Sequence, residues 1–442
     1  MRDNLKRISK NVIILFLLLS LLILTMLTWF SDMQPGNTER RRVISELFGG
    51  LFWNGDDVDS VYPGYEEYDY TMSILSPVRA AVRSDVGLTY LTNRDDAREL
   101  FERASAVLAD AMDSANTRQE LEDYQWRNIL SGDMILFDFE GEMPLDMLAA
   151  VIGSADYDAI ETQARYIVLF IHGETLSLAV MPKGGTPVSY TTTLQTAELA
   201  SLIREFDSAN ARFAFEDSVI GSYLPDEAIL LEDRSKPAVI KKSSTFTDYT
   251  STSSERIINA VLECFGYNPY TTGGYIESDD TRVYVEDLST LRISTDGSMS
   301  YYAPTQEEEI AVSGRTESSA IIMDAASMLD RVASDYIGDV TLYIMRAYYD
   351  MAEGRYVILF GCVADGIVLL FDDGYFARLE YVGTALVSAH LTIASYILTA
   401  QYDAILPDEQ AAAALNEKCT LFELRYVKNR NDEYHADWYY LK

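Results

Sequence analysis

The sequence predicts an α+β protein in which one N-terminal transmembrane helix precedes two or three extracytoplasmic domains of α/β and antiparallel-sheet type. Three observations lead to this class. An apolar run occupies residues 12–30, helical and strand-like hydrophobic periods alternate along the rest of the chain, and Gly-containing turns separate many of the strand-like segments. The chain has 442 residues, 48% of them hydrophobic, which is enough for two or three cores of ordinary size.

Residues 11–30 are expected to form the transmembrane helix. At a rise of about 1.5 Å per residue the apolar run reaches about 28 Å, close to the hydrocarbon thickness of about 30 Å. A cleavable signal peptide is the alternative, but its apolar region is shorter and ends in a small-x-small site. This run ends instead in Thr28, Trp29 and Phe30. Trp29 and Phe30 suit the aromatic belt at the outer membrane interface, and the helix is expected to remain as the anchor.

The basic flank at residues 1–10 sets the expected topology. Arg2, Lys6, Arg7 and Lys10 precede the span, and basic flanks stay on the cytoplasmic side. The three arginines at 40–42 oppose this orientation, but they follow the span by ten residues. The sequence therefore predicts a single-pass protein of the cell membrane with its N terminus in the cytoplasm and the bulk of the chain outside.

The span carries three polar residues, Ser20, Thr25 and Thr28, which form a candidate face for a partner helix. Ser20 and Thr28 lie eight residues apart, near one helical face, where each can hydrogen-bond a second helix at about 0.6 to 2 kcal/mol. The alternative is that these hydroxyls bond their own helix carbonyls and do nothing specific.

The exported part is strongly acidic, because the whole chain carries a formal charge of −34. Nucleic acid and anionic lipid head groups demand a basic patch, so both are poor partners. Solubility is the simpler interpretation of the charge, and a divalent-cation role is the alternative. The segment 54–60 comes nearest to a calcium loop, but it lacks the Glu at the twelfth position.

Cys264, Cys362 and Cys419 are far apart and odd in number, so they make no disulfide framework. Buried free thiols are favoured, with one bridge as the alternative.

Composition and periodicity divide the exported part into domains and linkers. Shifts toward Pro, Gly, Ser, Thr and Lys mark the boundaries. The expected units are a juxtamembrane linker at 31–92, an N-terminal α/β domain at 93–233, a linker at 234–254, a middle helix-plus-hairpin domain at 255–312, and a C-terminal helix-plus-meander domain at 313–442.

In the N-terminal domain, Asn93 is expected to cap a helix whose first turn carries Asp95 and Asp96. Strand and helix then alternate. The predicted elements are a strand at 134–139, a helix at 145–152, a hairpin of 166–172 and 175–181, a helix at 196–206 and a strand at 212–216.

Beyond residue 254 antiparallel hairpins dominate the prediction. Asp296-Gly297 between alternating segments is the strongest hairpin signal. Residues 382–401 lack charged side chains but alternate with period two, which favours a strand over a second span. The predicted helices are 255–265, 318–336 and 408–418; the strands are 282–286, 291–295, 298–302, 340–348, 356–363, 367–371, 376–381, 420–427 and 434–441.

The sequence offers little catalytic chemistry. Only His172, His390 and His435 are available, each in a predicted strand and far from the others. A zinc site needs three ligands, and a nucleophile needs an adjacent base, yet neither arrangement occurs at a recognisable spacing. We therefore expect a protein that is not an enzyme and that has no metal or cofactor.

Several segments resemble the YycH family of bacterial membrane regulators, and the C-terminal ones also resemble the sister YycI family. They are the span at 11–29, the strand and helix start at 135–145, the hairpin at 291–302, the segment 406–411 and the late Trp438. The resemblance implies an accessory protein of the WalK (YycG) sensor histidine kinase in a Gram-positive membrane, acting with a related YycI-like protein.

What the resemblance implies is regulation by binding, through the membrane helix and the exported domains, and it supplies no catalytic residue. The sign of the regulation, the ligand sensed and the oligomeric state stay open. The alternative function is an anchored envelope protein that binds cell-wall polymer or inhibits an exported hydrolase.

Overall fold

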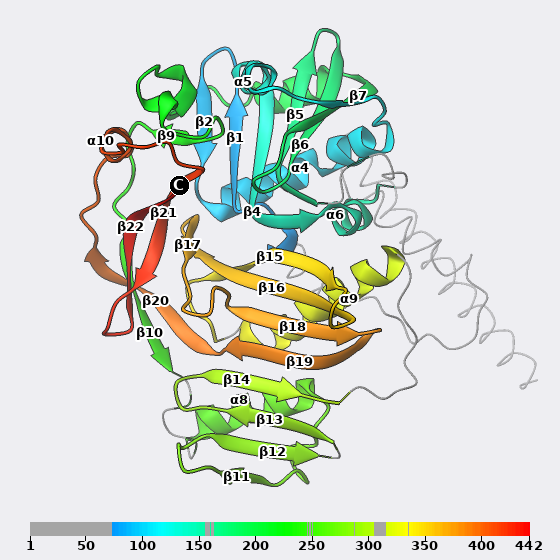
Figure 1. Cartoon of the computed structure of the whole chain (residues 1–442), viewed down its shortest axis with the longest axis vertical. Coiled ribbons are helices and arrows are strands. Elements are labelled where there is room, and N and C mark those ends of the chain that lie inside the picture. Colours follow the sequence, from blue (N-terminus) through cyan, green and yellow to red (C-terminus); the bar gives the residue numbers. More distant parts are fainter. Residues whose placement is uncertain are drawn as a thin grey trace, which may run out of the picture. The chain divides into compact units, whose positions relative to one another are not determined.

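The computed structural model describes residues 73–442, apart from 155–159, 161–162, 245, 247–248, 250, 287, 305–314 and 335. These residues form two β-sheets with helices packed on them, and the strand pairs are almost all antiparallel (Figure 1). The α+β class is confirmed for this part of the chain. No helix within it has both the length and the apolar character to cross a bilayer. The span predicted at 11–30 lies outside the described residues.

The first sheet is antiparallel throughout and has the strand order β9-β8-β2-β1-β4-β5-β6-β7-β3. Its strands are β1 (Arg79–Arg83), β2 (Leu88–Leu91), β3 (Arg118–Glu120), β4 (Met134–Pro144), β5 (Gln163–His172), β6 (Thr175–Met181), β7 (Val188–Gln195), β8 (Ala211–Phe213) and β9 (Ile229–Leu231).

Both faces of this sheet are buried. Ile135 and Phe137 of β4 pack with the helices α4 (Arg94–Asp113), α6 (Leu145–Ile152) and α7 (Ala197–Ile203). Met134 and Leu136 point to the opposite face and pack with α5 (Asp123–Ser131). Because successive side chains of a strand alternate between faces, burial on both sides explains why β4 and β5 read as nearly continuous apolar runs.

Helix α4 begins as the sequence predicts. Asn93 is the N-cap, and its side chain accepts a hydrogen bond from the backbone N–H of Asp95. Asp95 and Asp96 lie in the first turn, where carboxylates interact favourably with the helix dipole. Leu100 and Leu108 are buried in the same apolar core as Ile135 and Phe137 of the sheet.

The second sheet has the order β11-β12-β13-β14-β19-β18-β16-β15, and a branch β17-β21-β22-β10-β20 leaves it at the end of β16. Its strands are β10 (Ala238–Ser244), β11 (Gly274–Ile276), β12 (Arg282–Glu286), β13 (Ser289–Ile293), β14 (Ser298–Tyr302), β15 (Thr341–Asp350), β16 (Arg355–Ala364), β17 (Ile367–Leu369), β18 (Ala377–Val382), β19 (Ala385–Thr392), β20 (Ala394–Tyr402), β21 (Leu421–Lys428) and β22 (Glu433–Leu441).

Helices α8 (Thr252–Cys264) and α9 (Arg315–Leu329) contribute to the same apolar core as this sheet. A π-helical turn (Asp330–Ser334) extends α9. Ile321, Ile322 and Leu329 are buried, and they form the face of α9 that packs in the core. The short α10 (Asp408–Ala413) packs beside β9 and two 3-10 turns, Ala214–Glu216 and Ile220–Ser222. Residues 382–401, predicted as a strand, form β19 and most of β20.

Two segments predicted as linker contain strands. Residues 79–91, assigned to the 31–92 linker, form β1 and β2 in the middle of the first sheet. Residues 238–244, assigned to the 234–254 linker, form β10 between β20 and β22. Both strands are weak in sequence: β1 is built on small alanines, and β10 exposes its lysine-rich half. Tertiary packing overrides the local signal.

The predicted middle and C-terminal domains share one sheet, since β14 pairs with β19 from Ser298↔Thr392 to Tyr302↔Ser388. The two sheets also meet. Glu142 of β4 forms a parallel bridge with Arg346 of β15, and their side chains form an ion pair at 2.8 Å. At Gly141 a Cβ would collide with the backbone of Ile344 and Met345, so glycine permits this close approach.

Candidate functional site

The predicted site residues lie outside the part of the chain that the structure describes. These are the candidate partner-helix face and interface residues Ser20, Thr25, Thr28, Trp29 and Phe30, and the topology residues Arg2, Lys6, Arg7 and Lys10. The structure therefore leaves these predictions as they stand.

The histidines and cysteines fall at separate places. His172 ends β5, His390 lies in β19 beside the ring of Tyr375, and His435 of β22 contacts Asp403 with 2.8 Å between Nδ1 and Oδ1. The described residues contain no group of three metal-ligating side chains. All three cysteines are free thiols, two of them buried.

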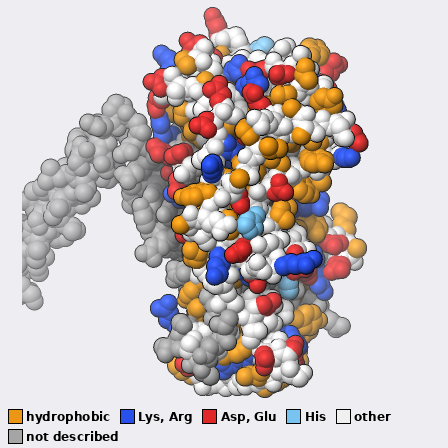
Figure 2. Space-filling view, turned by 90° about the vertical axis from the view of Figure 1, so that its left-hand side faces the viewer, with side chains coloured by type: hydrophobic (Ala, Val, Ile, Leu, Met, Phe, Trp, Pro, Cys, Tyr) orange, Lys and Arg blue, Asp and Glu red, His pale blue; other side chains and the backbone are white. Residues whose placement is uncertain are grey.

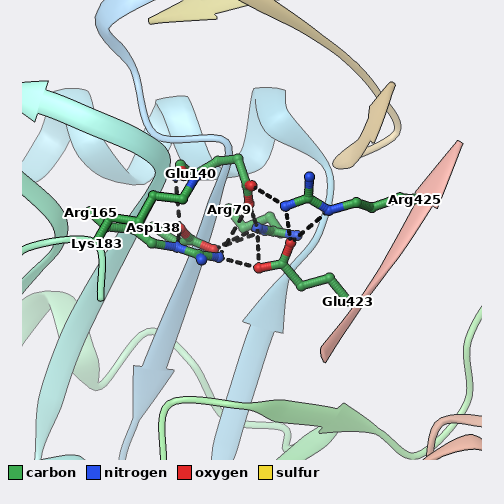
Figure 3. A network of polar contacts seen from close by, with 7 residues as sticks. All are labelled: Arg79, Asp138, Glu140, Arg165, Lys183, Glu423 and Arg425. Atoms are coloured by element: carbon green, nitrogen blue, oxygen red, sulfur yellow. Dashed lines mark hydrogen bonds and ion pairs between the residues drawn. The ribbon is translucent and has the colours of Figure 1, made fainter. Parts of the chain in front are cut away.

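The most unusual feature of the described chain is a cluster of six charged side chains where the first sheet meets β21. Three are arginines and three are carboxylates, so the formal charges balance. The members are Arg79 of β1, Asp138 and Glu140 of β4, Arg165 of β5, and Glu423 and Arg425 of β21 (Figure 3). Each side chain is at most 11% exposed.

Glu140 and Glu423 connect the two sides of the cluster. Glu140 Oε2 lies 2.5 Å from Arg79 Nη2, and Glu140 Oε1 lies 2.7 Å from Arg425 Nη2. Glu423 of β21 reaches in the opposite direction and forms an ion pair with Arg165. Its second oxygen lies 2.8 Å from Arg425 Nη2 on its own strand. The carboxylates thus bind arginines from both sheets.

A bulge in β4 presents the acids. The register of β4 against β5 shifts between Asp138 and Met143, and Glu140 adopts a left-handed backbone with φ 62°. Such a conformation costs a non-glycine residue of the order of 1 kcal/mol or more. The carboxylate of Asp138 accepts a hydrogen bond from the Glu140 N–H at 2.8 Å. Glu140 reaches Arg425 of β21, whereas Asp138 pairs with Arg79 and Arg165 of the first sheet.

The electrostatics of the cluster favour its ionised form. Burial disfavours the charged state of Glu423, but the neighbouring guanidinium groups, that of Arg165 most strongly, outweigh burial and hold the pKa of this carboxyl well below its usual range. Burial also opposes the charge of Arg79, yet the surrounding acids, Asp138 foremost, raise its pKa well above the ordinary value. Removal of one member would leave an uncompensated buried charge.

A cavity of about 60 Å³ adjoins the cluster. Its wall comes from the first sheet, the loop before β9, the β16–β17 turn and the β21–β22 hairpin. The polar and aromatic lining residues include Arg79, Tyr90, Asp138, Tyr166, Glu227, Arg234, Asp365, Glu423 and Trp438. Ligand pockets for drug-sized molecules measure about 300 to 1,000 Å³, so this cavity suits only a small chemical group.

One face of the molecule is mixed in character. Figure 2 shows one face on which acidic, basic and apolar side chains are interspersed without a continuous basic field.

No family model matches the chain, and no curated protein matches it. Among solved structures, the crystal structure of YycH from Bacillus subtilis matches with a TM-score of 0.51 over 84% of this chain and 94% of that chain, at 8% sequence identity. The chain has a YycH-like fold. An uncharacterized protein from Eubacterium rectale matches with a TM-score of 0.26 over 46% of this chain and 75% of that chain, at 9% identity, which is too low to assign a fold.

The YycH-like fold brings together residues that sequence reasoning did not connect. Asp138 and Arg165 lie inside apolar strand runs, where a charge requires a partner. Their positions were the sequence signal that could have indicated a buried ion pair. The partners Glu423 and Arg425 lie more than 250 positions later in the chain. No local pattern indicates that β21 would pack against β4 and β5.

Proposed function

We propose that this protein is a non-enzymatic, membrane-anchored regulator of a cell-envelope sensor histidine kinase. The observation that carries the proposal is the YycH-like fold, which spans most of the chain. YycH-family proteins regulate the WalK (YycG) kinase. We assign the kinase and a related YycI-like protein as partners.

The proposed mechanism is binding without turnover. Residues 11–30 cross the membrane with residues 1–10 in the cytoplasm, and Ser20, Thr25 and Thr28 face a helix of the kinase. The exported modules then contact the kinase outside the membrane. Within the exported part, buried ion pairs join the two sheets.

The experiment that tests the proposal is co-purification from membranes of the tagged full-length chain. A matched variant carries a poly-Leu span in place of residues 11–30. We expect a sensor histidine kinase to be recovered with the native span and lost with the replacement, because poly-Leu keeps the anchor and removes the polar face.

Recovery of the kinase with both spans would assign recognition to the exported modules alone. Recovery with neither would contradict the proposal and favour the alternative, an anchored protein that binds wall polymer or inhibits an exported hydrolase. One triple variant, with Ser20→Ala, Thr25→Ala and Thr28→Ala together, removes the polar face but keeps the rest of the native span. It therefore tests the polar face apart from the shape of the helix.

A further inference from the structure

The charges around the 60 Å³ cavity do not cancel. Each arginine at or just behind the wall has a carboxylate partner. Arg79, Arg165 and Arg425 belong to the six-residue cluster. Arg234 donates two hydrogen bonds to Asp408, from Nε at 2.7 Å and from Nη2 at 2.6 Å. The basic side chains are therefore already neutralised.

Two lining carboxylates, Glu227 and Asp365, are left over. Neither forms an ion pair or a hydrogen bond with another side chain among the described residues. Glu227 is half-buried in the loop before β9, and Asp365 is exposed at the β16–β17 turn. Burial raises the pKa of Glu227 and outweighs the attraction of the Arg165 guanidinium, which is already paired with Asp138 and Glu423. The carboxylates that line the cavity therefore outnumber the basic side chains that pair with them.

The same cavity has unused hydrogen-bonding capacity. Tyr166 is 7% exposed and lines the cavity, and its hydroxyl makes no hydrogen bond to a described residue. Tyr90 lines it as well, and burial raises the pKa of Tyr90 to about 12, so this hydroxyl is neutral near pH 7. The ring of Tyr90 adds an aromatic face, which attracts cations, whereas Arg165 already lies over the ring of Tyr166 and Arg234 over that of Trp438.

We propose that this cavity binds the primary ammonium group of a small organic amine, with Glu227 as its counter-ion and the Tyr166 hydroxyl as a hydrogen-bond acceptor. The volume equals the space of about four water molecules, which fits one ammonium head with its alkyl chain directed to solvent. An anion is disfavoured by the two unpaired carboxylates. A metal ion is disfavoured because the described residues offer no set of three ligating side chains.

The test is a titration of the purified full-length chain in detergent with n-butylamine, which is protonated at pH 7, and with n-butanol, its neutral counterpart. Saturation-transfer NMR on the ligand signals measures each dissociation constant. We expect saturable binding of the amine at least tenfold tighter than that of the alcohol. Glu227→Gln should weaken amine binding about tenfold, because one charge-assisted contact is lost.

Glu232→Gln is the matched control. Glu232 lies five positions later and is exposed, and it does not line the cavity, so its amine affinity should equal that of the native chain. Tyr166→Phe removes one hydroxyl and keeps the ring, and it should weaken amine binding severalfold. This second variant decides the result if Glu227→Gln does not fold.

Three outcomes would overturn the proposal: equal binding of amine and alcohol, amine binding unchanged by both Glu227→Gln and Tyr166→Phe, or displacement of the amine by stoichiometric Ca²⁺. The measurement involves no kinase. Its failure is therefore separate from a failure of the proposed regulatory function.

Discussion

Glu423 lies at the centre of the charged cluster, and its surroundings make substitution of this residue destabilising. Its side chain is 10% exposed and contacts Arg165 of the first sheet and Arg425 of its own strand. A buried ion pair contributes little net stability relative to apolar packing, but loss of one partner leaves the other charge unpaired in a poorly solvated place.

We therefore expect Glu423→Gln to lower the free energy of unfolding by about 3 to 5 kcal/mol, measured by urea denaturation. Glu417→Gln is the control, because Glu417 pairs with Lys442 while 58% exposed, and surface pairs contribute about 0 to 1 kcal/mol. Equal effects of the two substitutions would show that the cluster is not energetically special.

The same residue predicts a pH dependence. The folded pKa of Glu423 is depressed below its unfolded value, so its ionisation stabilises the fold at every pH above the unfolded pKa of about 4.3. That contribution is lost as pH falls from there toward the folded pKa, at up to about 1.4 kcal/mol per pH unit for one proton. Glu423→Gln should show a shallower loss between pH 4.5 and pH 3, and an unchanged slope would contradict the assignment.

At the scale of elements, β4 is the strand that connects the two sheets. Its bulge turns Glu140 toward β21, the next residue, Gly141, passes against the backbone of β15, and Glu142 pairs with Arg346. Glycine is required at 141 because any Cβ there would overlap Ile344 and Met345.

We expect Gly141→Ala to destabilise the fold by about 1 to 3 kcal/mol through overpacking, measured by thermal unfolding. Gly132→Ala is a matched control on the preceding turn. A Cβ at Gly132 would meet its nearest atom at 3.6 Å, in ordinary contact, and its φ of −92° suits any residue. If Gly141→Ala leaves the stability unchanged, the two sheets can move apart at this position without loss of free energy of unfolding.

The elements themselves were largely predictable, and the exceptions have a common cause. The helix capped by Asn93 and the hairpin at Asp296-Gly297 carry strong local signals, a cap and a turn, and both are found where expected. Strands β1 and β10 carry none, since Ala80 and Ala81 have weak strand preference and Lys241 faces solvent. Their neighbours in the sheets determine them.

At the scale of the whole molecule, one continuous apolar core reaches from Ile74 to Ala436 and includes residues of both sheets. The cluster and the cavity sit at the junction of those sheets. A substitution that weakens contacts at this junction should therefore destabilise strands of both sheets.

Hydrogen exchange followed by mass spectrometry tests this coupling. In Glu423→Gln we expect faster amide exchange in β1, β4 and β5 as well as in β21, with Glu417→Gln close to the native rates. Faster exchange limited to the β21–β22 hairpin would show that the sheets are independent units, as the sequence-based domain boundaries suggest.

The sequence by itself determined the class of the fold and most helices and hairpins, because period, caps and turns are local properties that nearby residues specify. Only the tertiary structure decided that residues 255–312 and 313–442 share a sheet, that β1 and β10 are strands, and that Arg79, Glu140 and Glu423 meet. Contacts of this kind depend on which apolar faces pack together, and the partners of a buried charge are chosen by that packing rather than by their distance along the chain.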